Sequence, residues 1–596
     1  MSRSFNGPDP VVTTVVAGRL QSIATHMAET MLRTSRSPIF QGLDFVTGIF
    51  DAKGRWVASK DYIPVLAGSM PAAYAAVSRR FEGDVEEGDI FLLNDPFSGN
   101  NHPPDVTLLK PVFHHQRLSF WVVSKGHHAD VGGNGVVGYN PNARDCWEDA
   151  LRIPPVRLVR RGEFERDIWD LVLCNVRLRE YVEGDLLCQI GALNVGEQDI
   201  HGLLETIGSE VVDTAIDDYL DSSARHMRRE VEALPDGAYE AERIIENGGS
   251  HHRHPVVIRL TLRIHGSQIE FDYRASDPQV QGYVNSTLPN TVASTLIGLF
   301  GVVDPDLPMN QGSIEPVTVI TEQGTVVDAL EPAATTLCTL STCEAIVEAV
   351  WSALAVADPA ISNAGWSRFG GVGETGVNKR TGSPFAAISL CAWGGAGATE
   401  GADGWDVIGT PVVMGGSRSI DPELHELVVP VTLERVELDV DSAGAGRWRG
   451  GLGSVLRWRV DQDDVTIVYY GSGTDSSTAP FGLAGGDGAH PNWTEITRAD
   501  GSVERLTVNS IIVVHEGDVI ETHNSGGGGF GPAHARPISA VLEDVRAGVV
   551  SVDAAFHDYR VLIDGEVVTD LRAAVERTTA TPDSDPIPLV LATSQP

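Results

Sequence analysis

Two short bursts of imidazole and carboxylate side chains stand out in the first quarter of the chain. His102 and Asp105 lie in the sequence NNHPPD, and His127, His128 and Asp130 lie in HHADVGG. Neutral imidazole and ionised carboxylate together form a ligand set that suits zinc, iron or manganese. The sequence therefore predicts a metal site, and with it a metal-dependent enzyme.

The elements between the bursts must bring them together. Residues 106–123 are largely apolar and predict one or two β-strands. The Pro103-Pro104 pair excludes a helix, so the first burst lies on an extended loop. Successive strand side chains point to opposite faces, so we expect one of His127 and His128 to bind the ion while the other packs or hydrogen-bonds. Asp130 can orient an imidazole. The alternative is that both bursts are ordinary polar surface loops.

The chain has 596 residues, which is too long for one core and predicts about three or four domains. We expect a multi-domain, β-rich α+β protein with an N-terminal α/β region that carries the metal and a β-rich C-terminal half. The later β-rich and Gly-rich regions should shape the pocket and a partner interface. The predicted segments are a metal-site domain (1–175), a helical segment (176–235), a Gly-rich α+β middle domain (236–428), a β-rich domain (429–535), short helices (536–577) and a flexible tail (578–596).

Hydrophobic periodicity predicts the individual elements. Helices are expected over 10–35, 70–81, 180–232 and 290–303, with two short helices within 537–559. Strands are expected over 44–50, 55–58, 88–93, 256–264 and 269–273, and residues 429–523 read as all-β.

Composition narrows the function classes. The formal net charge of −37 repels phosphate backbones, so we expect no nucleic-acid partner. No run of about 18 apolar residues predicts a membrane span, and the N-terminus lacks an apolar signal core. Six scattered cysteines without a CxxC pair are typical of reduced thiols. We therefore expect a cytoplasmic protein.

Other catalytic motifs are missing from the sequence. It contains no GxxxxGK[ST] phosphate loop and no GxSxG nucleophile elbow. The Gly-rich stretch at 526–531 lacks a lysine and favours a tight backbone turn over a phosphate cradle. Cys338 and Cys343 have no histidine nearby in sequence and are expected to be core residues.

Many ordered segments resemble the hydantoinase B / oxoprolinase family along nearly the full length. They include LDFVTGIFDAKGRWVAS (43–59), IPVLAGSM (63–70), GDIFLLNDPFSGNNHPPDVTLLKPVF (88–113), HHADVGG (127–133), DSAGAGRWRGGLG (441–453) and GGGGFG (526–531). The resemblance implies a B-type subunit that works beside a hydantoinase A-type, ATP-binding partner in a hetero-oligomer. The partner would phosphorylate the carbonyl oxygen of a cyclic amide, and this chain would open the ring.

The family's metal ligands correspond to Asp44, His102, Asp105 and His127 here. The resemblance implies a divalent transition metal, with zinc first and manganese or iron as alternatives. His128 or Asp130 would act as general base. ATP would be bound by the partner subunit.

Two alternatives stay open at this stage. Relatives include acetone and acetophenone carboxylases, so the substrate can be a ketone rather than a hydantoin or lactam. NNHPPD stands where a GTHLPD-like sequence is more usual, and residues 415–431 also depart from the common pattern, which leaves the substrate open. The third hypothesis is a non-catalytic scaffold that only seats the partner.

Overall fold

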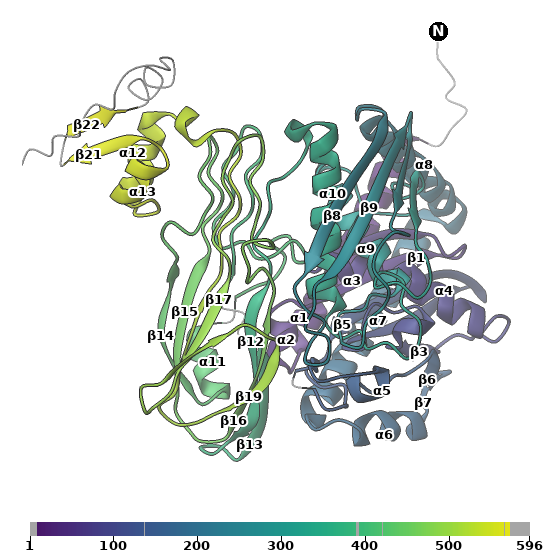
Figure 1. Cartoon of the computed structure of the whole chain (residues 1–596). Coiled ribbons are helices and arrows are strands. Elements are labelled where there is room, and N and C mark those ends of the chain that lie inside the picture. Colours follow the sequence, from purple (N-terminus) through teal and green to yellow (C-terminus); the bar gives the residue numbers. More distant parts are fainter. Residues whose placement is uncertain (1–8, 136, 389–392, 420, 565–566, 572–596) are drawn as a thin grey trace, which may run out of the picture.

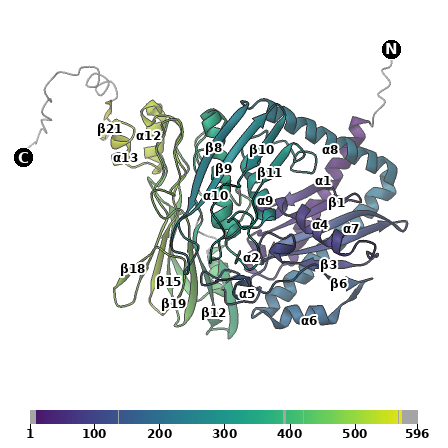
Figure 2. The ribbon, with the colours of Figure 1, turned by 45° about the vertical axis from the view of Figure 1, so that its right-hand side comes forward.

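The computed structural model describes residues 9–135, 137–388, 393–419, 421–564 and 567–571. The chain is a mixed α+β protein whose N-terminal and middle parts lie against a C-terminal β-layer (Figures 1 and 2). The small α12/α13 and β21/β22 unit lies at one end of that layer.

A seven-stranded sheet forms the centre of the N-terminal part, in the order β2-β1-β5-β4-β3-β6-β7. The central strands β1, β5, β4 and β3 are buried on both faces, which explains their long apolar runs. The bounds are β1 Phe45–Asp51, β2 Trp56–Asp61, β3 Ile90–Leu93, β4 Asp105–His114, β5 Arg117–His127, β6 Val156–Arg160 and β7 Glu163–Phe164.

Helices cover this sheet. The first, α1 (Pro10–Thr34), starts where the Asp9 carboxylate accepts a hydrogen bond from Val11 N–H and proline occupies the first turn. Its apolar face packs against α7 and the sheet. The expected helix over 180–232 is two helices, separated at Gly208, whose φ of 91° ends the first. The other helices here are α2 Pro38–Gln41, α3 Pro64–Gly68, α4 Met70–Arg80, α5 Cys146–Asp149, α6 Arg166–Cys174, α7 Arg179–Ile207 and α8 Ser209–Glu232.

Strand pairing brings the two predicted bursts together. The run between them forms a hairpin of β4 and β5, in which Asp105 pairs directly with His127. β5 also pairs with β1, where Phe45 faces Gly126. The start of β1, the start of β4 and the end of β5 therefore meet at one end of the sheet.

The middle part contains a four-stranded sheet in the order β11-β10-β9-β8 and two apolar helices. α10 and the π-helical turn before it, Cys338–Thr342, are together long and apolar enough to cross a membrane by length and composition. In the structure 72% of that window is buried inside the protein, against α9 and β8, as in a core helix. The bounds are β8 Gly237–Ile245, β9 Val256–His265, β10 Gln268–Asp272, β11 Val317–Ile320, α9 Leu288–Phe300 and α10 Cys343–Ala357.

Two sheets pack face to face in the C-terminal layer around a core that includes Trp458 and Ile467. Their orders are β13-β12-β16-β19 and β14-β15-β20-β17-β18. The first sheet contains strands from both sides of residue 428, where the sequence predicted a domain boundary. The predicted division of the chain into six segments stays a prediction. The bounds are β12 Gly370–Asn378, β13 Ser383–Ile388, α11 Pro422–Val428, β14 Val431–Leu438, β15 Ser454–Val460, β16 Val465–Gly471, β17 Trp493–Thr497, β18 Val503–Leu506, β19 Ser510–Val514, β20 Val519–His523, α12 Ile538–Ala547, α13 Val552–His557, β21 Val561–Asp564 and β22 Val567–Asp570.

Candidate metal centre

Buried asparagines shape the loop that carries the first burst. Asn100 directs its amide nitrogen to the backbone carbonyls of Asn94 (3.1 Å), His102 (2.9 Å) and Asp105 (2.7 Å). Its amide oxygen accepts a hydrogen bond from the Thr107 hydroxyl at 3.0 Å. The loop is therefore curved around one side chain, which turns His102 and Asp105 toward the same point.

This arrangement predicts a large effect for Asn100→Ala. Three buried carbonyls would lose their shared donor, and we expect the free energy of unfolding to fall by about 2–4 kcal/mol. Denaturant unfolding measures this cost. Asn142→Ala is the control: this exposed side chain accepts one hydrogen bond from the Ser250 hydroxyl, and its loss should cost at most about 1 kcal/mol. Equal stability of the two variants would contradict the role of Asn100.

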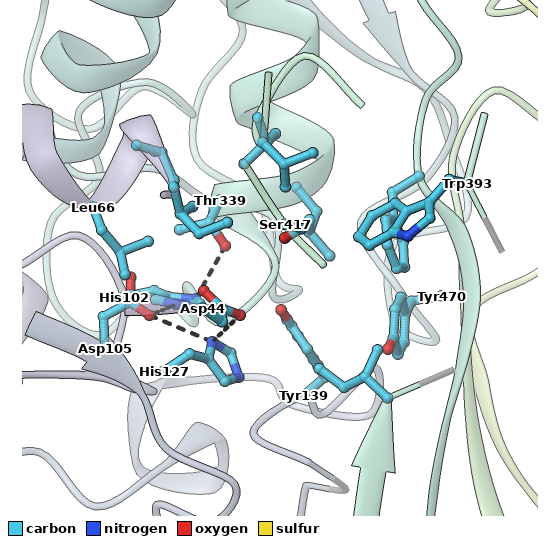
Figure 3. A pocket seen from close by; sticks show the side chains of 17 residues that line it. Asp44, Leu66, His102, Asp105, His127, Tyr139, Thr339, Trp393, Ser417 and Tyr470 are labelled. Atoms are coloured by element: carbon cyan, nitrogen blue, oxygen red, sulfur yellow. Dashed lines mark hydrogen bonds and ion pairs between the residues drawn. The ribbon is translucent and has the colours of Figure 1, made fainter. Parts of the chain in front are cut away.

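Three of the predicted ligands form one compact group (Figure 3). His102 Nε2 lies 2.8 Å from Asp105 Oδ1, and His127 Nδ1 lies 3.3 Å from the same oxygen. One ligand atom from each residue can be chosen so that all lie within 4.8 Å of one another. All three side chains are buried, with at most 2% of their surface exposed.

The environment prepares these groups to bind a cation. Burial lowers the pKa of His102, against the opposing effect of Asp105. Burial would raise the pKa of Asp105, but the two imidazoles outweigh it and hold this pKa below its usual range. Burial would lower the pKa of His127, but its hydrogen bond to Asp105 and the charges of Asp44 and Asp105 raise it. The site thus favours an ionised carboxylate beside a neutral His102.

Asp44 lies at the edge of this group. Its Oδ2 is 4.0 Å from His127 Nδ1, and its backbone carbonyl accepts a hydrogen bond from His127 N–H at 3.0 Å. Although 22% of its side chain is exposed, burial of the carboxylate raises its pKa to about 6, with His127 opposing this effect and the Asp105 charge adding to it. Its position next to the group is compatible with the ligand role implied by the resemblance, which stays a prediction.

His128 and Asp130, the two predicted general bases, lie outside the pocket beside the His/Asp group. His128 points to the opposite face of β5, where its Nε2 lies 3.0 Å from Gln189 Oε1 and its ring packs edge-on against Phe40. The Asp130 carboxylate accepts hydrogen bonds from the backbone N–H groups of Gly132 and Leu178, each at 3.0 Å. Neither side chain lines the pocket of the His/Asp group. Both side chains point away from the His/Asp group, and their hydrogen bonds hold neighbouring segments together.

The donor atoms fit a bound metal. The Thr336 carbonyl oxygen lies 2.8 Å from His102 Nδ1, so this nitrogen carries the proton and Nε2 carries a lone pair. In this tautomer the lone pair faces Asp105 Oδ1 at 2.8 Å, and His102 Nε2 has no hydrogen-bond donor among the described residues. A cation between them would relieve the repulsion of two lone pairs. Three protein ligands with room for a further one are typical of catalytic rather than structural zinc sites.

A pocket opens beside the group, and its lining residues come from the N-terminal, middle and C-terminal parts of the chain. Tyr139, Trp393 and Tyr470 face the His/Asp group across it (Figure 3). The Tyr139 and Tyr470 rings lie 4.9 Å apart, and the Phe369 ring stacks on Tyr470 at 5.3 Å. The later Gly-rich and β-rich regions therefore shape the pocket, as expected, although no spacing in the sequence singled out these aromatic residues.

Residues 9–533 match the family described as Hydantoinase B/oxoprolinase. This chain belongs to that family. The predicted membership is confirmed. The matched range contains the His/Asp group and every residue that lines the pocket.

Two relatives of this Hydantoinase B/oxoprolinase chain are close in sequence or structure. Caprolactamase subunit beta of Pseudomonas jessenii is 35% identical over 569 residues, which cover 94% of this chain and 97% of that protein. The crystal structure of the ATP-dependent caprolactamase from the same organism matches with a TM-score of 0.88 and 33% identity, over 97% of this chain and 100% of that chain.

A more distant relative shares the same fold. The nucleotide-free structure of an acetone carboxylase matches this Hydantoinase B/oxoprolinase chain with a TM-score of 0.88, over 97% of this chain and 84% of that chain. Its sequence identity is 19%, so this likeness shows a shared fold alone.

Proposed function

We propose that the chain is the metal-dependent catalytic subunit of an ATP-dependent lactamase, and that its substrate is a neutral, largely apolar lactam. The similarity to caprolactamase subunit beta supports the reaction class. In the net reaction the ring C–N bond is hydrolysed to an amino acid while ATP gives ADP and phosphate.

The residues that line the pocket support a neutral substrate rather than a charged one. Among the described lining residues, the ionisable side chains are those of Asp44, Asp105, His102, His127 and two tyrosines, and none is Lys or Arg. A ring that carries a carboxylate, such as 5-oxoproline, would bury that group without a Lys or Arg side chain to pair with it, which is costly. A neutral ring with methylene groups would instead be matched by the apolar wall, formed by Ile63, Val65, Leu66, Leu340, Phe369, Ile388, Trp393, Val412 and Val413.

His102, Asp105 and His127 would hold the metal, with Asp44 as the proposed fourth ligand and zinc as the proposed ion. Such an ion supplies Lewis acidity, which activates water and stabilises developing negative charge. The chain itself excludes bulk water with its apolar wall. The Tyr470 hydroxyl is buried and has no hydrogen-bond partner among the described residues, so it is available to bind an oxygen of the substrate.

The partner would be a hydantoinase A-type subunit that binds ATP and phosphorylates the lactam oxygen. The name "subunit beta" of the caprolactamase relative supports a hetero-oligomer. The ketone carboxylase alternative has the shared fold as its support.

Reconstitution with an A-type partner tests the proposal. We expect ATP-dependent ring opening of caprolactam with a kcat/KM at least about 100-fold above that for 5-oxoproline, because only the second substrate buries an unpaired carboxylate. Omission of ATP or of the partner should abolish turnover. Preference for 5-oxoproline would contradict the neutral-substrate proposal. Incorporation of bicarbonate into a ketone without any ring opening would overturn the lactamase in favour of a carboxylase.

A further inference from the structure

A second carboxylate, remote from the pocket, holds the segment that contacts a proposed metal ligand. Asp149 is 1% exposed and ends the short helix α5. Its Oδ2 accepts hydrogen bonds from the backbone N–H groups of Thr335 (2.7 Å) and Thr336 (3.0 Å), and its Oδ1 accepts one from the Thr336 hydroxyl (2.6 Å). Three donors from one dipeptide thus converge on one buried carboxylate.

The same dipeptide contacts the His/Asp group through the backbone carbonyl of Thr336. The Thr336 carbonyl is the acceptor that lies 2.8 Å from His102 Nδ1, and the Thr339 hydroxyl lies 3.3 Å from that nitrogen. A ligating imidazole needs its second nitrogen held by an acceptor, because this selects the tautomer and aims the first nitrogen. The position of one carbonyl therefore decides how His102 presents Nε2.

The link between α5 and the segment around Thr335 does not depend on the Asp149 carboxylate alone. The N-terminal end of α5 already binds the same segment, because Cys146 N–H donates to the Pro332 carbonyl at 2.8 Å. The hydrogen-bond partners of the Asp149 side chain are neutral groups of Thr335 and Thr336, and burial raises the pKa of its carboxyl group to about 7 against their opposing effect. What it adds is a fixed direction for the Thr335–Thr336 peptide.

We propose that Asp149 is a positioning residue for metal binding: it clamps Thr335 and Thr336 so that the Thr336 carbonyl holds His102 in the tautomer that offers Nε2 to the ion. This inference rests on the proposed metal function of His102. It assigns Asp149 no contact with the substrate.

Zinc affinity of the metal-free full chain tests the inference, with Zn²⁺ alone titrated against a chromophoric chelator. We expect Asp149→Ala to weaken Zn²⁺ binding about 10–100-fold. Asp149→Asn should recover most of the affinity, because its amide oxygen can accept from both backbone N–H groups and its amide nitrogen can donate to the Thr336 hydroxyl. Asp145→Ala is the matched control on the same helix: it removes the N-cap contacts to Trp147 and Glu148, and should leave affinity within about twofold.

A second readout follows the tautomer directly. In metal-free protein labelled with ¹⁵N-histidine, the Nδ1–H signal that disappears in His102→Ala should persist in Asp149→Asn and be lost or averaged in Asp149→Ala. If Asp149→Ala does not fold, Thr336→Val removes only the hydroxyl donor and should weaken Zn²⁺ binding about 2–5-fold. Wild-type affinity and an unchanged signal in Asp149→Ala, or in Thr336→Val where the first variant does not fold, would overturn the inference. A wild-type chain that binds no Zn²⁺ would instead overturn the proposed metal function.

Discussion

His127→Ala is expected to release the metal and to lower ATP-dependent ring opening by at least about 10³-fold, and His102→Ala to do the same. Each substitution removes one of three ligands that share a single point, and the ion's contribution to the barrier is several kcal/mol, at about 1.4 kcal/mol for each factor of ten. Elemental analysis of the purified chain measures the metal, and reconstitution with the partner measures turnover.

The neighbouring imidazole provides a matched control. His128→Gln changes the residue that directly follows β5, but its side chain points away from the His/Asp group and lies beside Gln189. We expect this variant to keep its metal and most of its activity. Retention of metal by His127→Ala and His102→Ala, or its loss from His128→Gln alone, would contradict the assignment. Activity that survives in both alanine variants would favour the scaffold hypothesis.

Arg368→Ala is expected to lower the free energy of unfolding by about 3–5 kcal/mol. Arg368 is buried and forms a two-pronged ion pair with Glu348, with Nη2–Oε2 at 2.7 Å and Nε–Oε1 at 3.1 Å. Its Nη1 also donates to the Ile244 carbonyl at 2.7 Å. Removal of the guanidinium would leave the Glu348 carboxylate buried, with Arg243 at 3.5 Å as its remaining ion-pair partner.

Denaturant unfolding compares this variant with two others. Arg33→Ala breaks an exposed pair with Glu29 and should cost less than about 0.5 kcal/mol. Arg368→Met combined with Glu348→Gln removes both charges and should recover much of the lost stability. A cost for Arg368→Ala as small as that for Arg33→Ala would show that the buried pair contributes little. Because Phe369 N–H donates to the buried Glu344 at 2.7 Å, loosening this region should also disturb the pocket wall.

Local patterns predicted much of the N-terminal part. The β-rich segments 44–50 and 55–58 predicted β1 and β2, and the apolar run 106–123, interpreted as one or two strands, forms β4 and β5. The alternation of strand side chains also separated His127 from His128. Proline at 103 and 104 correctly placed the first burst on a loop. Asp44, in contrast, came from family resemblance, because no spacing connects it to residues 102–127.

Features formed by distant segments escaped prediction. Helix α10 is buried almost all round, so its apolar residues do not repeat on one face and its period is hidden. The pocket wall joins Tyr139, Phe369 and Tyr470: the pairing of β12 with β16 brings Tyr470 beside Phe369, and Tyr139 comes from the segment between β5 and α5. Neither His128 nor Asp130, the predicted bases, lines that pocket, although both lie close to His127 in the sequence.

Because the pairing at the end of β5 is uninterrupted, the number of residues in this part of the strand decides which face each imidazole occupies. The β4/β5 ladder runs in regular register from Asp105 to Val112, and the single irregularity lies beyond it, toward the turn. One residue deleted between that irregularity and His127 would exchange the faces of the two imidazoles and place His128 opposite Asp105. Length changes at the turn around His115 would leave both faces unchanged. Natural or engineered variants of this hairpin should therefore differ in length at the turn and not along the strand that leads to the metal.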